Sequence, residues 1–175
     1  MQIRATVTLD QISRKIVLVT QENETPEHLA LKLAAFILFF KINPNIEISS
    51  KNPAIANQEF KPDLVAFNEA GEISHWIECG NVATNKIEKL AKRLSNAKII
   101  LLKELPREAE NMRRILNKNE VRNKEQIEIW SFPENQFQEW IQALEESVEI
   151  YGEQSDRSFN LVANSTAFNF NFLSY

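Results

Sequence analysis

Residues 62–80 read PDLVAFNEAGEISHWIECG, which is two β-strand patterns joined by a turn. Apolar and β-branched residues fill 63–68 and 73–79, and a glycine lies in the segment between them, as is typical of a β-hairpin. Asp63 stands at the start of the first strand and Glu78 near the end of the second. We therefore expect this hairpin, with a carboxylate on each strand, to lie in the sheet of the protein.

The length of the turn determines how the two carboxylates lie. An even turn, made either of Ala70-Gly71 or of residues 69–72, places Asp63 opposite Glu78 on one face, with Cβ atoms about 5 Å apart. An odd turn would place them on opposite faces, and a bulge in the hairpin remains open as a further alternative. Facing carboxylates repel each other, and a hard divalent cation such as Mg²⁺, which takes oxygen ligands, would relieve that repulsion. The alternative is an exposed hairpin that merely begins with Asp and ends with Glu.

The segments next to the hairpin predict alternating helices and strands. Thr25 and Pro26 suit an N-cap and a first helical position. The helix that they begin runs to about residue 42 and is apolar nearly all round, so it should be buried against a sheet. Further along the chain we expect a strand at 45–49, a loop at 50–61, a helix at 85–96, a buried strand at 98–103, a helix at 106–118 and a strand at 126–132.

The two ends of the chain add further elements. Residues 3–9 and 15–20 read as strands, and residues 133–150 as an amphipathic helix. The tail, 158–172, forms either a terminal hairpin around Asn164-Ser165 or a partly ordered end. Nothing in the sequence marks a linker, so we expect a single α/β domain over residues 1–175, with a mixed central sheet flanked by helices and extra N- and C-terminal strands.

Composition removes several classes of site. The chain has 175 residues but only three glycines, too far apart for a glycine-rich phosphate loop, so no nucleotide cofactor is expected through such a loop. One cysteine, Cys79, and two histidines, His28 and His75, exclude an internal disulfide and a multi-thiolate zinc site. Metal binding through carboxylates remains open.

Charge is distributed unevenly along the chain. The net charge is -4, yet residues 86–124 contain 12 lysines and arginines and 5 aspartates and glutamates. Nucleic acid is thus a possible partner, and solvated helix faces are the alternative. The longest apolar stretch, 29–40, is shorter than the ~18 residues of a membrane span, and the N-terminus lacks a signal-peptide core, so we expect a cytoplasmic protein. The candidates for contact with nucleic acid are Lys92, Arg93, Arg113 and Arg114.

The hairpin and its surroundings resemble a known family of enzymes. Pro62-Asp63, then Glu78, then a lysine-bearing helix resemble the PD-(D/E)XK nuclease superfamily, whose core has the order αβββαβ. More narrowly, the chain resembles the YaeQ family over roughly residues 16–165. The residues that carry this narrower likeness are Glu24-Thr25 and Glu27 ahead of the segment LAAF, Pro62-Asp63-Leu64, the segment WIECG at 76–80, and Lys89.

The resemblance implies a restriction-endonuclease-like core and a Mg- or Mn-dependent nuclease. Asp63, Glu78 and Glu27 would be metal ligands. The superfamily places a lysine two residues after the glutamate, where this chain has Gly80. Lys89 or Lys86, on the following helix, would take its place beside the attacking water. The alternative is a non-catalytic member of the fold that binds nucleic acid or a protein partner, or a regulatory protein without nucleic acid.

Overall fold

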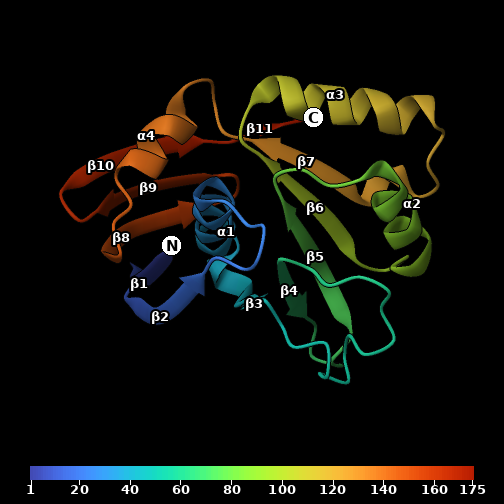
Figure 1. Ribbon diagram of the computed structural model, residues 1–175, viewed down its shortest axis with the longest axis horizontal. Helices are drawn as coiled ribbons and strands as arrows, with labels where there is room; N and C mark the ends of the chain where they lie inside the picture. The colour runs from blue at the N-terminus through green and yellow to red at the C-terminus, as the bar shows by residue number, and fades with distance from the viewer.

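Two β-sheets with one helix between them form the framework of the protein (Figure 1). The computed structural model describes residues 1–175. One sheet has five strands in the order β10-β9-β8-β1-β2, and the other has six in the order β11-β7-β6-β5-β4-β3. Both sheets combine parallel and antiparallel pairs. The fold is thus mixed α/β, but with two sheets instead of the one central sheet that we expected.

The five-stranded sheet consists of β1 (Gln2–Leu9), β2 (Ile12–Val19), β8 (Ser147–Ser155), β9 (Ser158–Ala163) and β10 (Thr166–Asn171). The six-stranded sheet consists of β3 (Asn45–Ile46), β4 (Leu64–Phe67), β5 (Ile73–Cys79), β6 (Lys98–Lys103), β7 (Ile127–Ser131) and β11 (Leu173–Ser174). The helices are α1 (Pro26–Leu38), α2 (Thr84–Arg93), α3 (Pro106–Lys118) and α4 (Gln136–Gln142), with short 3-10 turns at Phe40–Ile42 and Lys124–Gln126. No helix has the length and hydropathy that a membrane crossing would need.

Helix α1 lies between the two sheets and contacts strands of both (Figure 1). Its N-cap is Thr25, whose side chain accepts the His28 N–H, and Pro26 follows as predicted. Every residue from position 29 to position 38 is buried, because the apolar surface that surrounds the helix meets a sheet on each side. A core cluster of 33 residues joins α1 to both sheets.

Helices α2 and α3 cover the other face of the six-stranded sheet. They pack on Trp76 of β5 and on Ile99 and Leu101 of β6, which belong to a second core cluster of 14 residues. The alternation of side chains along β5 and β6 therefore divides that sheet between two cores. Ile77 and Cys79 face α1, while Trp76 faces α2 and α3.

The hairpin has the expected register at its open end. Leu64 faces Ile77 and Val65 faces Trp76, which extends to Asp63 opposite Glu78. The register shifts after Ala66, so that Phe67 faces Ile73. The turn then spans residues 69–71, closed by the Asn68 N–H bond to the Glu72 carbonyl. The expectation of an even turn was wrong, and a β-bulge supplies the extra residue that restores the register.

The region after β7 differs most from the expectation. Helix α4 covers only seven residues, and β8 begins at Ser147, where a helix to residue 150 was expected. Val148 and Ile150 are buried while Glu149 and Tyr151 are exposed, and this alternation suits a strand beside β1. Elsewhere, α1 ends at Leu38 instead of residue 42, and β3 is shorter than 45–49. The tail forms the hairpin β9–β10 around Asn164, the first of the two alternatives.

Candidate metal and phosphate site

The candidate site lies where the carboxyl end of β5 meets the start of β4 and the N-terminus of α1. Strands β5 and β6 are parallel, and ligands of open α/β sheets commonly bind beyond the carboxyl ends of such strands. Asp63 directly precedes β4, and Glu78 lies next to the last residue of β5. The polar side chains of the site project from this edge toward α1 on one side and toward α2 on the other.

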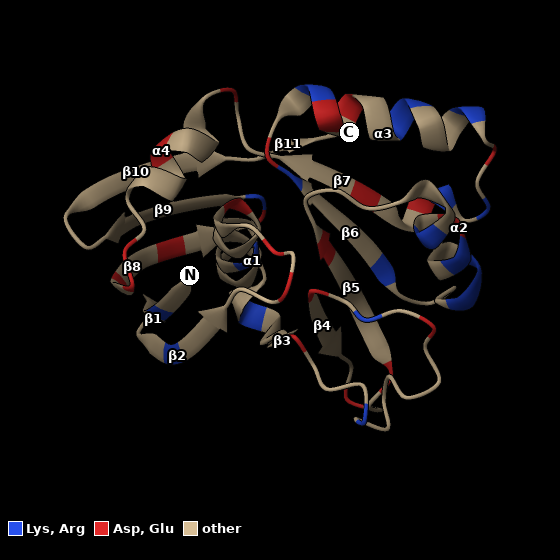
Figure 2. Cartoon of the chain, in the orientation of Figure 1, with Lys and Arg blue, Asp and Glu red and all other residues tan.

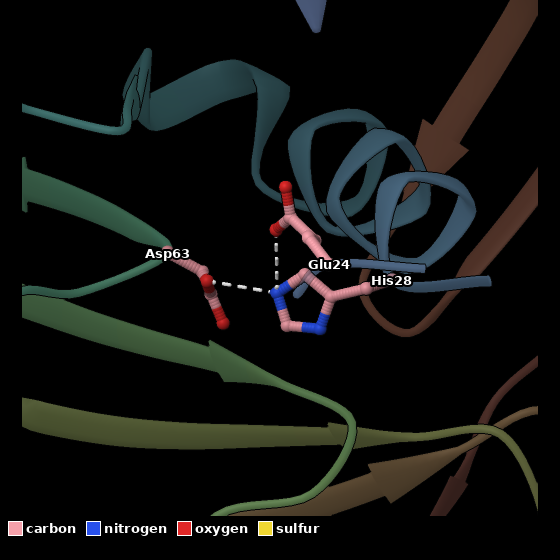
Figure 3. A group of neighbouring side chains, drawn as sticks. All are labelled: Glu24, His28 and Asp63. Carbon is pink, nitrogen blue, oxygen red and sulfur yellow. Dashed lines mark hydrogen bonds and ion pairs between the residues drawn. The ribbon is translucent and has the colours of Figure 1, made fainter. Parts of the chain in front are cut away.

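Asp63 is oriented by two hydrogen bonds. Its Oδ2 accepts the backbone N–H of Cys79 at 2.8 Å, and its Oδ1 lies 3.0 Å from His28 Nε2 (Figure 3). Burial alone would raise the pKa of Asp63, but the His28 hydrogen bond and charge, helped by the Cys79 N–H and by Lys32, outweigh it and hold the pKa below its usual range. Asp63 is thus held as a carboxylate.

Glu24 completes a group of three potential metal ligands. Its Oε1 lies 3.2 Å from His28 Nε2, and Figure 3 shows both carboxylates directed at this one nitrogen. The ligand atoms of Glu24, His28 and Asp63 all lie within 4.8 Å of one another. No other group of three histidine, cysteine or acidic side chains in the chain is as close. Two carboxylates and an imidazole form a donor set that suits Mn²⁺ better than Mg²⁺, because Mg²⁺ takes oxygen ligands.

Lys32 supplies a positive charge next to this group. It projects from the middle of α1, is only 2% exposed, and bonds Glu24 and, at 2.6 Å, Glu47. Its Nζ also lies 3.8 Å from Asp63 Oδ1. Burial disfavours the charged form, but the two hydrogen bonds outweigh that cost and raise the pKa of Lys32. A cavity of about 300 Å³ opens beside Lys32, Glu47 and Asp63.

Glu78 faces the opposite core. It shares a strand face with Trp76, whose Nε1–H donates to Glu78 Oε1 at 2.6 Å, and Lys86 Nζ of α2 lies 2.7 Å from the same oxygen. Burial, with a contribution from the charge of Asp63, raises the pKa of Glu78 despite the opposing charge of Lys86. Asp63 precedes its strand and turns toward α1, so the two carboxylates have different partners although their positions face each other.

Gly80 lies in the turn that leaves β5, with a left-handed backbone of φ +69°. Lys103, at the end of the neighbouring strand β6, donates a hydrogen bond to the Gly80 carbonyl. Lys103 is 2% exposed, and burial lowers the pKa of its ammonium group. Lys103 thus reaches the backbone of Gly80 from the adjacent strand. We did not predict this lysine from the sequence.

Of the other residues predicted for the site, Lys86 lies close to it, whereas Lys89 and Glu27 do not take part in it. Lys86 lies beside Glu78, but Lys89 is half exposed and bonds Glu59 at 2.6 Å instead. Glu27 is partly exposed in the first turn of α1 and does not belong to the ligand group, in which Glu24 takes the place expected for it.

The four residues predicted to contact nucleic acid differ in exposure and in hydrogen-bond partners. Arg113 donates to the backbone oxygens of Tyr175 and Ile127, so it holds the β11 segment and is not a free phosphate ligand. Arg114 is exposed and donates to the neighbouring Asn111. Lys92 and Arg93 are exposed on the last turn of α2.

A signal for the missed ligands is present in the sequence. Glu24, His28 and Lys32 follow one another at intervals of four. Glu24 directly precedes the N-cap, and His28 and Lys32 lie on one side of a helix that is apolar over most of its surface. A polar stripe on a buried helix needs polar partners. Asp63 and Glu47 are those partners, and both come from segments distant in the sequence.

Comparison with known proteins agrees with this geometry at the level of the fold. The family model described as YaeQ protein matches residues 13–172. The chain belongs to the YaeQ family. No curated protein matches it.

Two solved YaeQ structures have a similar fold. The YaeQ protein from Xanthomonas axonopodis pv. citri superposes with a TM-score of 0.76 at 14% identity, covering 99% of this chain and 96% of that one. The YaeQ protein from Pseudomonas syringae gives a TM-score of 0.70 at 14% identity, with 99% and 93% covered. At this identity the likeness extends to the fold of the YaeQ family, and the chemistry of the site must be argued from its own residues.

Proposed function

We propose that this YaeQ chain is a metal-dependent phosphodiesterase that acts on nucleic acid, built on a restriction-endonuclease-like core. The order α1, β3, β4, β5, α2, β6 supports the proposed PD-(D/E)XK core, because it repeats the order αβββαβ. The observation that carries the proposal is the convergence of Glu24, His28 and Asp63 at the open end of the β4–β5 hairpin.

The donor set determines which metal would fit. Glu24, His28 and Asp63 offer two carboxylates and one imidazole nitrogen, so Mn²⁺ suits them better than Mg²⁺. A divalent ion bound there would lower the pKa of a water molecule and polarise a phosphodiester. His28 Nε2 points between the two carboxylates, and the Cys79 N–H fixes Asp63 in place.

The residues on the α2 side would act on the phosphate. Lys86 carries the ammonium nearest to Glu78, and Glu78 is held by Trp76. Lys103, which is buried, fixes the Gly80 carbonyl and is a second lysine near the end of β5. Positive charges held in a low-dielectric site stabilise developing negative charge strongly. We assign Lys86 to the phosphate and Lys103 to positioning of the turn at Gly80.

A second function has an observation of its own. Lys32 and Lys86 already form ion pairs with carboxylates on the two faces of the hairpin, and position 80 carries no lysine. These features favour a non-catalytic module that uses the same fold to bind nucleic acid or a protein partner.

One pair of measurements separates the two functions. We expect Mn²⁺ to bind the wild type in titration calorimetry and to support cleavage of DNA or RNA, and Asp63→Asn to abolish both. Glu134→Gln, an exposed carboxylate remote in sequence from the site, is the matched control. Binding of Mn²⁺ without cleavage would select the non-catalytic module, and no binding would refute the metal site.

A further inference from the structure

The loop that joins β3 to β4 covers part of a basic surface. Residues 47–63 contain no helix or strand. Loops of this length in compact domains are commonly functional. Glu59 in this loop binds α2 with both carboxylate oxygens, Oε1 to Lys89 at 2.6 Å and Oε2 to Arg93 at 3.2 Å.

In this contact two cationic side chains bind one carboxylate, an arrangement in which a phosphate could replace the carboxylate. Lys89 and Arg93 are four residues apart and lie on one side of α2. Each is about half exposed, so the pair lies at the surface and is open to competition by another anion. The ring of Phe60 lies 5.6 Å from the ammonium groups of both Lys86 and Lys89, and Lys86 also donates to the Lys61 carbonyl.

The basic surface continues beyond the part that Glu59 covers. The segment after α3 packs on α2, since Asn119 donates to Glu88, and Asn123 and Gln126 donate to the Ala91 carbonyl. Figure 2 shows lysines and arginines gathered on α2 and at the adjacent end of α3. Four cations of α2, of the end of α3 and of the segment between α3 and β7 are exposed and have no carboxylate within 4.0 Å: Lys92, Lys118, Arg122 and Lys124.

The α1 side of the site has the opposite charge. A cavity of about 440 Å³ beside His28 and Gly80 is lined by Glu22, Glu24 and Glu104 among others, and by no lysine or arginine. A phosphate backbone would be repelled there and attracted across α2. The charges therefore define one direction from which a polyanion can reach the open end of the hairpin.

We propose that the basic surface of α2 and the α3–β7 segment binds the phosphate backbone of nucleic acid, and that Glu59 occupies a phosphate position on it in the free protein. This inference rests on the proposed function for its choice of polyanion. The incoming backbone displaces Glu59 from Lys89 and Arg93 and follows Lys92, Arg122 and Lys124. Glu59 thereby opposes binding, and only a polyanion with several phosphates in contact competes with it.

The test measures binding without metal, so that cleavage has no part in it. Fluorescence anisotropy of a labelled single-stranded oligonucleotide in EDTA is recorded at several salt concentrations. We expect Glu59→Gln to bind about fivefold more tightly than wild type, because Lys89 and Arg93 are released for phosphate. Glu153→Gln, an exposed carboxylate on β8, changes the net charge equally and should leave affinity nearly unchanged.

A second variant tests the rest of the surface. Lys92→Gln/Arg122→Gln/Lys124→Gln should weaken binding at least about tenfold and reduce the salt slope by about 2, since each phosphate contact on a single strand contributes about 0.7. Arg4→Gln/Lys15→Gln/Lys41→Gln removes the same charge on and beside β1 and β2 and should change the slope little.

The outcomes are distinct. Equal effects of Glu59→Gln and Glu153→Gln, or of the two triple variants, would overturn the assigned surface, as would failure of both wild type and Glu59→Gln to bind at low salt. If the expected shifts occur but no cleavage is found with Mn²⁺, the phosphate surface stands and the catalytic proposal falls.

Discussion

The two faces of the six-stranded sheet hold carboxylates with different balances of charge. On the α1 face, Glu24, Glu47 and Asp63 share one buried ammonium, that of Lys32. On the α2 face, the single carboxylate of Glu78 is paired with Lys86. Negative charge is in excess on the α1 side of the hairpin, whereas on the α2 side Glu78 and Lys86 balance each other one to one. The excess of carboxylates on the first side suits the cation site that we propose there.

The largest effect is expected from Lys32→Met, because it leaves three carboxylates close together with no lysine among them. Removing one partner from a buried ionic group costs about 3–5 kcal/mol, and we expect the free energy of unfolding in urea to fall by that amount. Added Mn²⁺ should restore part of the loss. Lys51→Met, at an exposed position without an ion pair, is the control. A loss no larger than that of the control would show that Lys32 does not balance the acidic face.

Lys86→Met tests the other face and should cost less, about 2 kcal/mol near neutral pH. Glu78 keeps its hydrogen bond from Trp76, and its raised pKa makes protonation accessible. We therefore expect the cost to shrink as the pH falls, as measured by urea unfolding at about pH 7.5 and about pH 5. A cost that stays constant over this range would contradict the raised pKa of Glu78.

Features that depend on residues close together in the sequence could be predicted, and features that depend on residues far apart in the sequence could not. The register at the open end of the hairpin, the N-cap at Thr25 and the buried strand β6 depend on local pattern and were predicted, whereas the length of the hairpin turn was not. The prediction of a helix over 133–150 was wrong in its second half, because a short apolar pattern fits the period of a helix as well as that of a strand. The strand is favoured there by its parallel partner β1, which lies far away in the sequence.

The acidic face was missed for a related reason. A lysine in a helix is usually solvated, and the spacing of His28 and Lys32 indicates a polar stripe without identifying the three carboxylates that lie near Lys32. The positions of Asp63 and Glu78 face each other as expected, but Asp63 precedes β4 and the direction of its side chain depends on His28 and on the N–H of Cys79. Such contacts arise only when α1 packs against the sheet.

The pH dependence of stability should have opposite signs on the two faces. The folded pKa of Asp63 lies below 3.8, so its stabilising contribution is complete above that pH and is lost as the pH falls through the folded pKa. The difference in unfolding free energy between wild type and Asp63→Asn should therefore narrow from about pH 6 to about pH 3.

Glu78 provides the converse measurement. Its folded pKa is raised above 4.5, so its contribution is greatest at low pH and is lost as the pH rises through the folded pKa. The difference between wild type and Glu78→Gln should widen over the same acid range. If the difference in unfolding free energy from wild type changed with pH in the same direction for Asp63→Asn and Glu78→Gln, the two faces would not differ as we infer.

The smallest effect is expected at Gly80, where the two faces meet. A Cβ at this position would lie 3.5 Å from His28 Nδ1 and from Leu31, which is ordinary contact, so the cost of Gly80→Ala comes from its φ of +69°. We expect about 1 kcal/mol from urea unfolding, and the same from Gly71→Ala in the distant turn, whose φ is +78°. A much larger cost at Gly80 alone would mean that packing excludes a side chain there. Equal costs would mean that the backbone tolerates one, so that Gly80→Lys can test directly whether an ammonium at this position increases cleavage.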